Sequence, residues 1–277
     1  MKTLRPQYQK PTSYKASGLS SRLRRLLPVI IAAAAIESQY CSAQDIGSAD
    51  SFAALANQAI TFAGAGNFVN GNLAVTPGTS ITGSFTQNGT IYTGQDAPAV
   101  NAMDDATTAY NDIVAETPTT NMSSEELGGL TLTNGIYSFN EFAGGAADVS
   151  GTLTLSGPGN FVFQMDTTFT SGANANIVLE NGAQATDVFW QIGSSATFGA
   201  DSSLQGSFLA YTSITAGAGS EDSGSLVALG AALSFDGGNI ITAVPEPSSY
   251  MLFSIGALVI GVAARRGVFF RNTPHCI

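Results

Sequence analysis

The stretch "SFLAYTSITAGAGSEDSG", residues 207–224, recurs in outline three more times in the second half of the chain. The other members are "VFQMDTTFTSGANANIVL" (162–179), "VFWQIGSSATFGADSSLQG" (188–206) and "SLVALGAALSFDGGNI" (225–240). Each member has an apolar opening, a centre where apolar and polar residues alternate, and a turn with glycine or asparagine. Strand-and-turn units of about 20 residues that stack on one another form a β-solenoid. The repeat therefore predicts this fold.

The four units share a column of hydroxyl-bearing residues: Thr170, Thr197, Thr215 and Ser234. The last two steps of the column are 18 and 19 residues long, and the first is 27 because it contains the extra loop "ENGAQATD". Side chains alternate between the two faces of a strand, so we expect these hydroxyls to point outward and large apolar residues to point inward. The predicted inward residues are Phe161, Phe163, Phe189, Ile192, Phe208, Leu209, Leu226 and Leu229.

The first half of the chain has the same β character with one interruption. From Phe52 to Gly94, short apolar runs alternate with glycine and asparagine, which predicts short strands and tight turns. Asp96 can cap a helix and Pro118 can end one, so we predict one long α-helix over about residues 97–115. The residues that recur there at helical spacing are Val100, Met103, Thr107, Tyr110 and Val114.

Charge is distributed very unevenly along the chain. All 10 lysines and arginines lie near the two ends, and residues 26–264 contain neither. Of the 20 acidic residues, only Glu37 precedes Gln44. A body this acidic repels nucleic acid and anionic lipid headgroups, so we expect no nucleic-acid partner.

The N-terminal segment has the pattern of a secretory signal peptide. Basic residues precede the apolar run Leu26–Ile36, and "CSA" ends at Ala43, with small residues at the positions that a signal peptidase reads. Cys41 raises lipidation as an alternative, but "SQYC" lacks the small and apolar residues expected before a lipidated cysteine. We therefore predict that residues 1–43 are removed on export.

The C-terminal segment contains an uncharged run of 17 residues, 248–264, followed at once by Arg265 and Arg266. This length lies at the lower edge for a membrane-spanning helix, and the arginine pair would stay on the cytoplasmic side. A buried C-terminal helix is the alternative interpretation.

Together with the motif Pro245, Glu246 and Pro247, this run and its arginines resemble the PEP-CTERM sorting tail. The resemblance implies that residues 244–277 hold a precursor in the inner membrane through the helix 248–264. It further implies that a sorting protease cuts near the motif, after which the body is released or attached outside the cell.

Few catalytic chemistries fit the body between the two ends. Cys41, Cys276 and His275 all lie in the segments expected to be lost. Nucleophilic triads and zinc sites need cysteine or histidine, and solenoid polysaccharide lyases use arginine or lysine as the base. We therefore expect no enzyme activity, no catalytic residue and no cofactor.

Carboxylates are the remaining reactive groups. Asp201, Asp222 and Asp236 lie near the turns of successive units. They could hydrolyse a glycosidic bond, hold calcium, or simply be solvated turn residues, and the last interpretation predicts no metal site.

Five sequence blocks resemble the microbial ice-binding-like family, and they occur in that family's order. The blocks are "VNGNLAVTPGTSITG" (69–83), "DDATTAYND" (104–112), "LGGLTLTNGIYSF" (127–139), "GTLTLSGPGNFVFQ" (151–164) and "NGAQATDVFWQIGSSATFG" (181–199). The resemblance implies a mainly β domain over residues 44–243, built as a right-handed, three-faced β-solenoid with one long α-helix packed alongside.

The resemblance also implies that one flat face of short outward residues holds ordered water and binds ice. Residues Asp201, Glu221, Asp222 and Asp236 bring charge near this face, and Ser225 stands where the family usually has arginine. The candidate ice-binding residues are Thr168, Thr170, Ser171, Asn174, Ser195, Thr197, Ser203, Ser213, Thr215 and Asn239.

Two functions follow as hypotheses. The first is an exported protein that adsorbs to ice and inhibits its growth or recrystallisation, with the ice crystal as its partner. The second is a non-enzymatic adhesive or structural protein of the cell surface or exopolysaccharide matrix, with extracellular polysaccharide as partner and calcium as a candidate ligand. Both place the mature body outside the cell or on its surface.

Overall fold

A computed structural model describes residues 44–122, 124–140 and 144–244. The predicted signal peptide 1–43 and the predicted transmembrane helix 248–264 lie outside the described residues, as does the motif Pro245, Glu246 and Pro247. Within the described part of the chain, no helix has the length and apolar character needed to cross a membrane.

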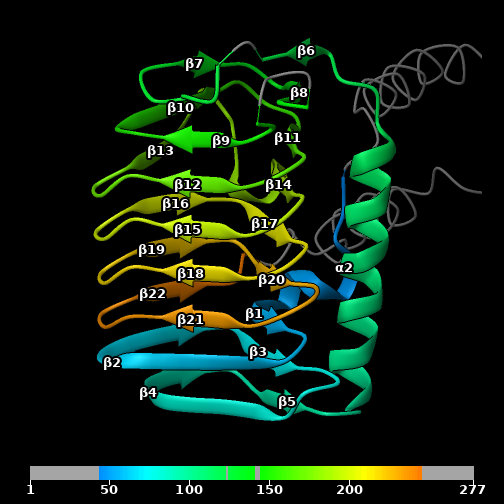
Figure 1. The fold of residues 1–277 in the computed structure, drawn as a ribbon, viewed down its shortest axis with the longest axis vertical. Helices are drawn as coiled ribbons and strands as arrows, with labels where there is room; N and C mark the ends of the chain where they lie inside the picture. The colour runs from blue at the N-terminus through cyan, green and yellow to red at the C-terminus, as the bar shows by residue number, and fades with distance from the viewer. Residues whose placement is uncertain (1–43, 123, 141–143, 245–277) are drawn as a thin grey trace, which may run out of the picture. The chain divides into compact units, whose positions relative to one another are not determined.

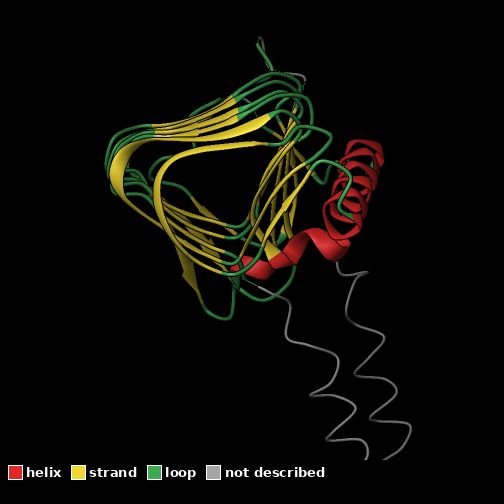
Figure 2. Ribbon diagram, turned by 90° about the horizontal axis from the view of Figure 1, so that it is seen from below, coloured by secondary structure: helices red, strands yellow, loops and turns green. Residues whose placement is uncertain are grey.

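The described residues form parallel strands wound into a coil with three sides (Figure 2). The first side is a sheet of nine strands. In spatial order these strands are β5 (Ile91–Thr93), β3 (Asn72–Val75), β1 (Phe52–Ala56), β20 (Leu226–Ala228), β17 (Ser207–Ala210), β14 (Val188–Ile192), β11 (Phe161–Met165), β8 (Gly135–Ser138) and β6 (Thr120–Asn121).

A second sheet forms the other two sides. Strands β2 (Ala59–Asn70) and β4 (Ser80–Asn88) belong to both sides, because the first half of β2 pairs with β21 and its second half with β22. The second side continues with β21 (Leu233–Phe235), β18 (Ile214–Ala216), β15 (Ala196–Phe198), β12 (Phe169–Ser171) and β9 (Ala147–Val149). The third side continues with β22 (Ile240–Thr242), β19 (Glu221–Ser223), β16 (Ser203–Gln205), β13 (Asn176–Glu180), β10 (Thr152–Ser156) and β7 (Thr131–Leu132).

The prediction of a mainly β fold with one long helix is confirmed. The α-helix α2 spans Ala97–Ala115, and two short 3-10 helices, η1 (Gly47–Ser51) and η2 (Ala185–Asp187), complete the described elements. Asp96 lies at the N-cap of α2, but its Oδ2 accepts a hydrogen bond from the Thr93 N–H at 2.8 Å instead of capping the helix.

The coils are not stacked in chain order (Figure 1). The first coil lies on the last one, since β1 pairs with β20 and β2 pairs with β21 and β22. Helix α2 therefore carries the chain from β5 at one end of the first side to β6 at the other. Eight steps between strands span about 38 Å, of which a helix of 19 residues covers about 28 Å.

Helix α2 packs on the first side through small residues (Figure 2). Of the residues predicted at helical spacing, Met103 is buried and Tyr110 packs against the same cluster. The prediction fails at two others, because Thr107 is exposed and the Val114 side chain is 54% exposed. Alanines let the helix backbone approach the sheet closely, which larger side chains on the same stripe would prevent. The buried helix residues are Ala99, Ala102, Met103, Ala106, Ala109 and Ile113.

The central strands of the first side are buried on both faces, which explains why three predicted inward residues do not point inward. Phe189 and Leu209 belong to the cluster that packs under α2, and Leu229 packs against that cluster. The residues next to the first two, Trp190 and Phe208, point into the coil. There the rings of Tyr137, Phe163, Trp190 and Phe208 stack in successive coils, with centroids 5.4, 3.9 and 5.3 Å apart.

At the corner between the second and third sides, one residue of each successive coil adopts the left-handed backbone conformation. Asn174, Asp201, Gly219, Gly238 and Gly66 have φ values of 59°, 55°, 72°, 78° and 83°. Each backbone N–H in the column from Asn174 to Gly238 donates to the next coil. Asparagine and aspartate tolerate this conformation better than most residues, which accounts for Asp201 at this position.

Immediately before this corner the backbones of adjacent coils are in close contact. A Cβ atom placed on Gly199 would overlap the backbone of Gly172 and Ala173. A Cβ placed on Gly172 would instead lie 3.7 Å from its nearest neighbours, Ser150 Cα and Val149 O. Gly199 is therefore required by the stacking, whereas Gly172 is not.

One carboxyl group lies inside the coil. Asp222 is 5% exposed, its register partners on both sides are Leu204 and Ile241, and neither carboxylate oxygen has a hydrogen-bond partner. Burial raises the pKa of Asp222 well above its ordinary value, because a charged carboxylate would lose its hydration there. Burial therefore disfavours the charged form of this group in the folded state.

Replacing Asp222 by leucine should stabilise the fold. The variant Asp222→Leu removes an unpartnered buried polar group, so we expect the free energy of unfolding to rise by about 1–3 kcal/mol. The pKa of the Asp222 carboxyl is higher in the folded chain than in the unfolded chain. Its contribution to the stability of the wild type is therefore complete below the unfolded pKa of about 4 and is lost as pH rises through the folded pKa. The gain should therefore grow with pH in urea unfolding. The exposed neighbour Glu221 supplies the control variant Glu221→Leu, for which no such growth is expected.

The two glycines should respond oppositely to the same substitution. Gly199→Ala forces apart two stacked backbones, and we expect the free energy of unfolding to fall by about 1–3 kcal/mol. Gly172→Ala should change it by less than about 0.5 kcal/mol. Thermal unfolding followed by circular dichroism compares the two variants, and equal effects would contradict the contact described above.

Candidate functional site

The second side presents a continuous outward column of short polar side chains. Thr170, Thr197, Thr215 and Ser234 are register partners in β12, β15, β18 and β21, so the column read from the repeat exists in the fold. Beyond Ser234 the column continues through Thr61 of β2 to Thr82 of β4, and at its other end Thr170 pairs with Asp148 of β9. We call the outward surface of this side the threonine face.

A second column runs beside the first, two residues earlier in the chain, immediately before strands β12, β15 and β18. It contains the predicted residues Thr168, Ser195 and Ser213, all partly exposed. The hydroxyl oxygens of Ser195 and Ser213 lie 3.1 Å apart and share a hydrogen bond. The backbone positions that carry these side chains are about 4.8 Å apart along a column and about 6.6 Å apart across columns, as parallel strands require. The hydroxyls therefore form a two-dimensional grid.

Charge is confined to the margins of the threonine face. At one end of the main column Asp148 Oδ1 accepts a hydrogen bond from the Thr170 hydroxyl at 2.6 Å, and Asp148 Oδ2 accepts one from Ser150 at 2.6 Å. Asp236 follows Ser234 by two residues, next to the corner. In contrast, Thr197 and Thr215 are exposed, and within the described part of the chain their hydroxyls have no hydrogen-bond partner.

Two predicted residues of the site point inward. Ser171 follows Thr170 directly, so the alternation of the strand turns it into the coil, where its Oγ accepts a hydrogen bond from the Gly199 N–H at 3.0 Å. Asn239 is 0% exposed and its Nδ2 donates to Asn67 Oδ1 at 3.0 Å. Its Oδ1 accepts from both the N–H and the hydroxyl of Ser220. Both residues stabilise the interior and cannot contact a surface ligand.

Two further predicted residues lie off the threonine face. Ser203 belongs to β16 on the third side, in register with Asn176 and Glu221. Asn174 is exposed but occupies the left-handed corner. The structure therefore brings together Thr168, Thr170, Ser195, Thr197, Ser213 and Thr215 of the predicted set.

Thr61 and Thr82 are part of the same column but were not among the predicted residues. They belong to β2 and β4, which precede α2 in the chain. A signal for one of them exists, because "TSIT" occurs at both 79–82 and 212–215. This short repeat aligns Thr82 with Thr215 from the sequence alone.

The other two sides differ from the threonine face. The first side is covered by α2. The third side mixes residue types in one column, where Glu221, Ile240 and Phe68 are register partners. Ile240 and Phe68 are 40% and 39% exposed. The threonine face is therefore the side whose outward grid is small, neutral and rich in hydroxyls.

Metal binding has no geometric basis in the described residues. These residues contain no group of three or more histidine, cysteine, aspartate or glutamate side chains that could hold an ion. The three aspartates weighed for calcium do not converge, since Asp222 is buried inside the coil while Asp201 is exposed at a corner.

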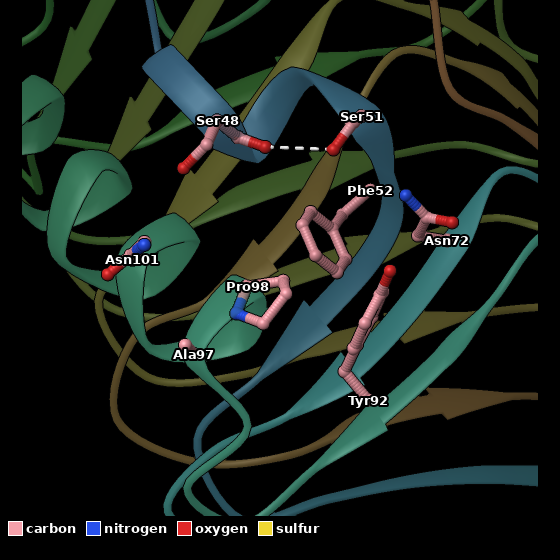
Figure 3. Close-up of a pocket in the computed structure, with 8 residues that line it drawn as sticks. All are labelled: Ser48, Ser51, Phe52, Asn72, Tyr92, Ala97, Pro98 and Asn101. Atoms are coloured by element: carbon pink, nitrogen blue, oxygen red, sulfur yellow. Dashed lines mark hydrogen bonds between the residues drawn. The ribbon is translucent and has the colours of Figure 1, made fainter.

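A cavity of about 310 Å³ lies between η1, β5 and the start of α2 (Figure 3). Its serine hydroxyls are already bonded: Ser51 donates to the Ser48 carbonyl at 3.0 Å, and Ser48 donates to Asp105 Oδ2 at 2.5 Å. Bonds from Ser48 lower the pKa of Asp105. These contacts attach the N-terminal segment to the helix, and they assemble no pair of acid and base over the cavity.

The comparisons with known proteins agree with this geometry. The ice-binding-like family model matches residues 54–241, and the PEP-CTERM protein-sorting motif matches residues 243–266. An ice-binding protein from Nostoc sp. (strain HG1) is 36% identical over 250 residues, which cover 82% of this chain and 90% of that protein.

Solved structures give the same result. The crystal structure of an ice-binding protein from Antarctomyces psychrotrophicus matches with a TM-score of 0.63 and 35% identity, over 72% of this chain and 98% of that one. An ice-binding protein from an Antarctic biological consortium matches with a TM-score of 0.67 and 34% identity, over 74% and 92%. The resemblance seen in the sequence blocks is confirmed: this chain belongs to the ice-binding-like family and carries a PEP-CTERM sorting motif.

Proposed function

We propose that this protein binds ice through the threonine face and thereby limits ice growth or recrystallisation outside the cell. The observation that carries the proposal is the in-register column Thr170, Thr197, Thr215, Ser234, Thr61 and Thr82. The names of the relatives support the same ligand.

The spacing of the grid suits a layer of ordered water. Hydrogen bonds between water oxygens of about 2.75 Å, arranged tetrahedrally, place second neighbours about 4.5 Å apart. This distance is close to the spacing of about 4.8 Å between the successive strands that carry the column. Water bound to successive hydroxyls can therefore keep bonding geometry close to that of ice, and bound water is an effective bridging partner.

The low charge of the face supports the same ligand. A charged side chain orients its own hydration shell and would hold water in geometries that ice does not share. The exposed centre of the face, Thr197 and Thr215, has uncharged register partners, and Asp148 and Asp236 lie at its margins. We accordingly propose a non-enzymatic role, in which the protein acts by adsorption.

The sorting motif supports export of the body. We propose that the precursor is held in the inner membrane by the predicted helix 248–264 with Arg265 and Arg266 on the cytoplasmic side. A sorting protease then cuts near Pro245, Glu246 and Pro247, and the body reaches the cell surface or the medium. This route would bring the threonine face to the water that freezes first.

A bulky side chain at the centre of the threonine face should weaken ice adsorption. Thr215→Tyr projects a ring above the grid and separates it from the crystal. We expect retention of the purified full chain on a growing ice surface to fall by about tenfold, equivalent to about 1.4 kcal/mol of adsorption free energy. Inhibition of recrystallisation should fall with it.

The matched control is Thr152→Tyr, because Thr152 is an exposed strand threonine on the third side. This variant should retain ice adsorption. The opposite result would contradict the proposal. If Thr152→Tyr lost adsorption and Thr215→Tyr kept it, the ice contact would lie on the third side instead.

Altering the sorting motif should stop processing. Replacing Pro245, Glu246 and Pro247 by alanine removes the predicted recognition element, so we expect the uncut precursor to accumulate in the inner membrane. Immunoblots of membrane, surface and medium fractions check this outcome. Normal release of the body from this variant would show that cleavage does not depend on the motif.

A further inference from the structure

We propose that the groove between α2 and the corner joining the first side to the threonine face is a binding site for neutral hexose units of a polysaccharide. The groove has a volume of about 280 Å³. The residues that line it include Tyr110 and Asn111 of α2, Asp166 and Tyr211 of the corner, and Gln191 of β14. This site is separate from the hydroxyl grid and does not rest on the ice-binding proposal.

Two tyrosine rings form the apolar part of the groove. The rings of Tyr110 and Tyr211 have centroids 6.0 Å apart and an interplanar angle of 40°. Tyr211 is 60% exposed although it flanks a tightly packed strand. A hexopyranose ring has a face of C–H groups that packs on an aromatic ring, and tyrosine offers such a surface at low cost in side-chain entropy.

The inner tyrosine is held in place by a buried amide. Gln191 is 4% exposed, and its Nε2 donates to Tyr110 Oη at 3.0 Å and to the Met165 carbonyl at 3.3 Å. Because Tyr110 Oη accepts this bond, its own hydrogen can be donated to a ligand. Burial, and less strongly the nearby Tyr211 and Asp166, raise the pKa of Tyr110, while the bond from Gln191 acts in the opposite direction.

Polar groups at the rim match the hydroxyl edge of a sugar. Asp166 is exposed, and a carboxylate can accept hydrogen bonds from two adjacent hydroxyls. Asn111 is also exposed, and its amide both donates and accepts. Residues 26–264 contain no lysine or arginine, so Asp166 would repel an acidic sugar without compensation. The charge of Asp166 favours neutral hexoses over uronic acids.

The cavity of Figure 3 lacks this combination. Its Tyr92 ring packs against Phe52 at 5.7 Å, and Asn72 Oδ1 already accepts the Thr90 N–H at 3.0 Å. The groove beside Tyr211 instead leaves an aromatic ring, a carboxylate and an amide facing solvent. Tyr211 precedes Ser213 of the threonine face by two residues, so a bound polysaccharide would lie along the margin of the hydroxyl grid.

Affinity electrophoresis of the full chain through native gels tests the proposal above the freezing point. The gels contain a neutral β-glucan, a dextran, a mannan or the acidic polymer alginate. We expect at least one neutral polymer to retard the chain and alginate to leave it unretarded. Tyr211→Ala should weaken the apparent affinity for the retarding polymer by about tenfold, since it removes the stacking surface.

Phe68→Ala is the matched control, because Phe68 is an exposed aromatic residue on the third side. This variant should be retarded like the wild type, and so should Thr215→Tyr, which separates sugar binding from ice adsorption. The proposal is overturned if none of the neutral polymers retards the chain, or if Tyr211→Ala and Phe68→Ala behave alike. Unchanged circular dichroism in Tyr211→Ala confirms that the fold is intact.

Discussion

The register between the first and last coils is the constraint on which the rest of the structure depends. Residues 60–62 of β2 lie on residues 233–235 of β21, although the two segments are far apart in the chain. The rings of Phe62 and Phe235 stack there with centroids 5.0 Å apart and planes 16° apart. At the next corner, Asn239 donates to Asn67. A slip of one residue would turn every side chain to the opposite face.

This register can be maintained without ion pairs because the inward residues repeat the same chemistry from coil to coil. Residues 26–264 contain no lysine or arginine, so two side chains of this span cannot form a lysine or arginine ion pair with each other. Stability must then come from the hydrogen bonds between strands, from the stacked rings around Trp190, and from the packing of α2 on the first side. The helix packs through a stripe of buried alanines, namely Ala99, Ala102, Ala106 and Ala109. A surface free of cations follows from the same composition, and it leaves the threonine face uncharged at its centre.

The sequence predicts the features that recur with the repeat of about 20 residues. The predictions fail at positions where this repeat is interrupted. The alignment of four units located the column from Thr170 to Ser234, because equivalent positions in stacked strands share a face. It could not place Thr61 next to Ser234, since that contact joins coils from opposite halves of the chain. Ser171 and Asn239 were misassigned because a shift of one residue, or a corner, reverses the side chain.

The helix therefore contributes to the candidate site without touching it. At one end of the column the Thr170 hydroxyl is bound by Asp148, so the hydroxyls free to order water run from Thr197 through Ser234 and Thr61 to Thr82. The middle of this series is the junction of the first and last coils. That junction forms only because α2 returns the chain to the far end of the stack, from which it winds back to meet β2. Packing of the alanine stripe thus determines whether the threonine face is one grid or two shorter ones.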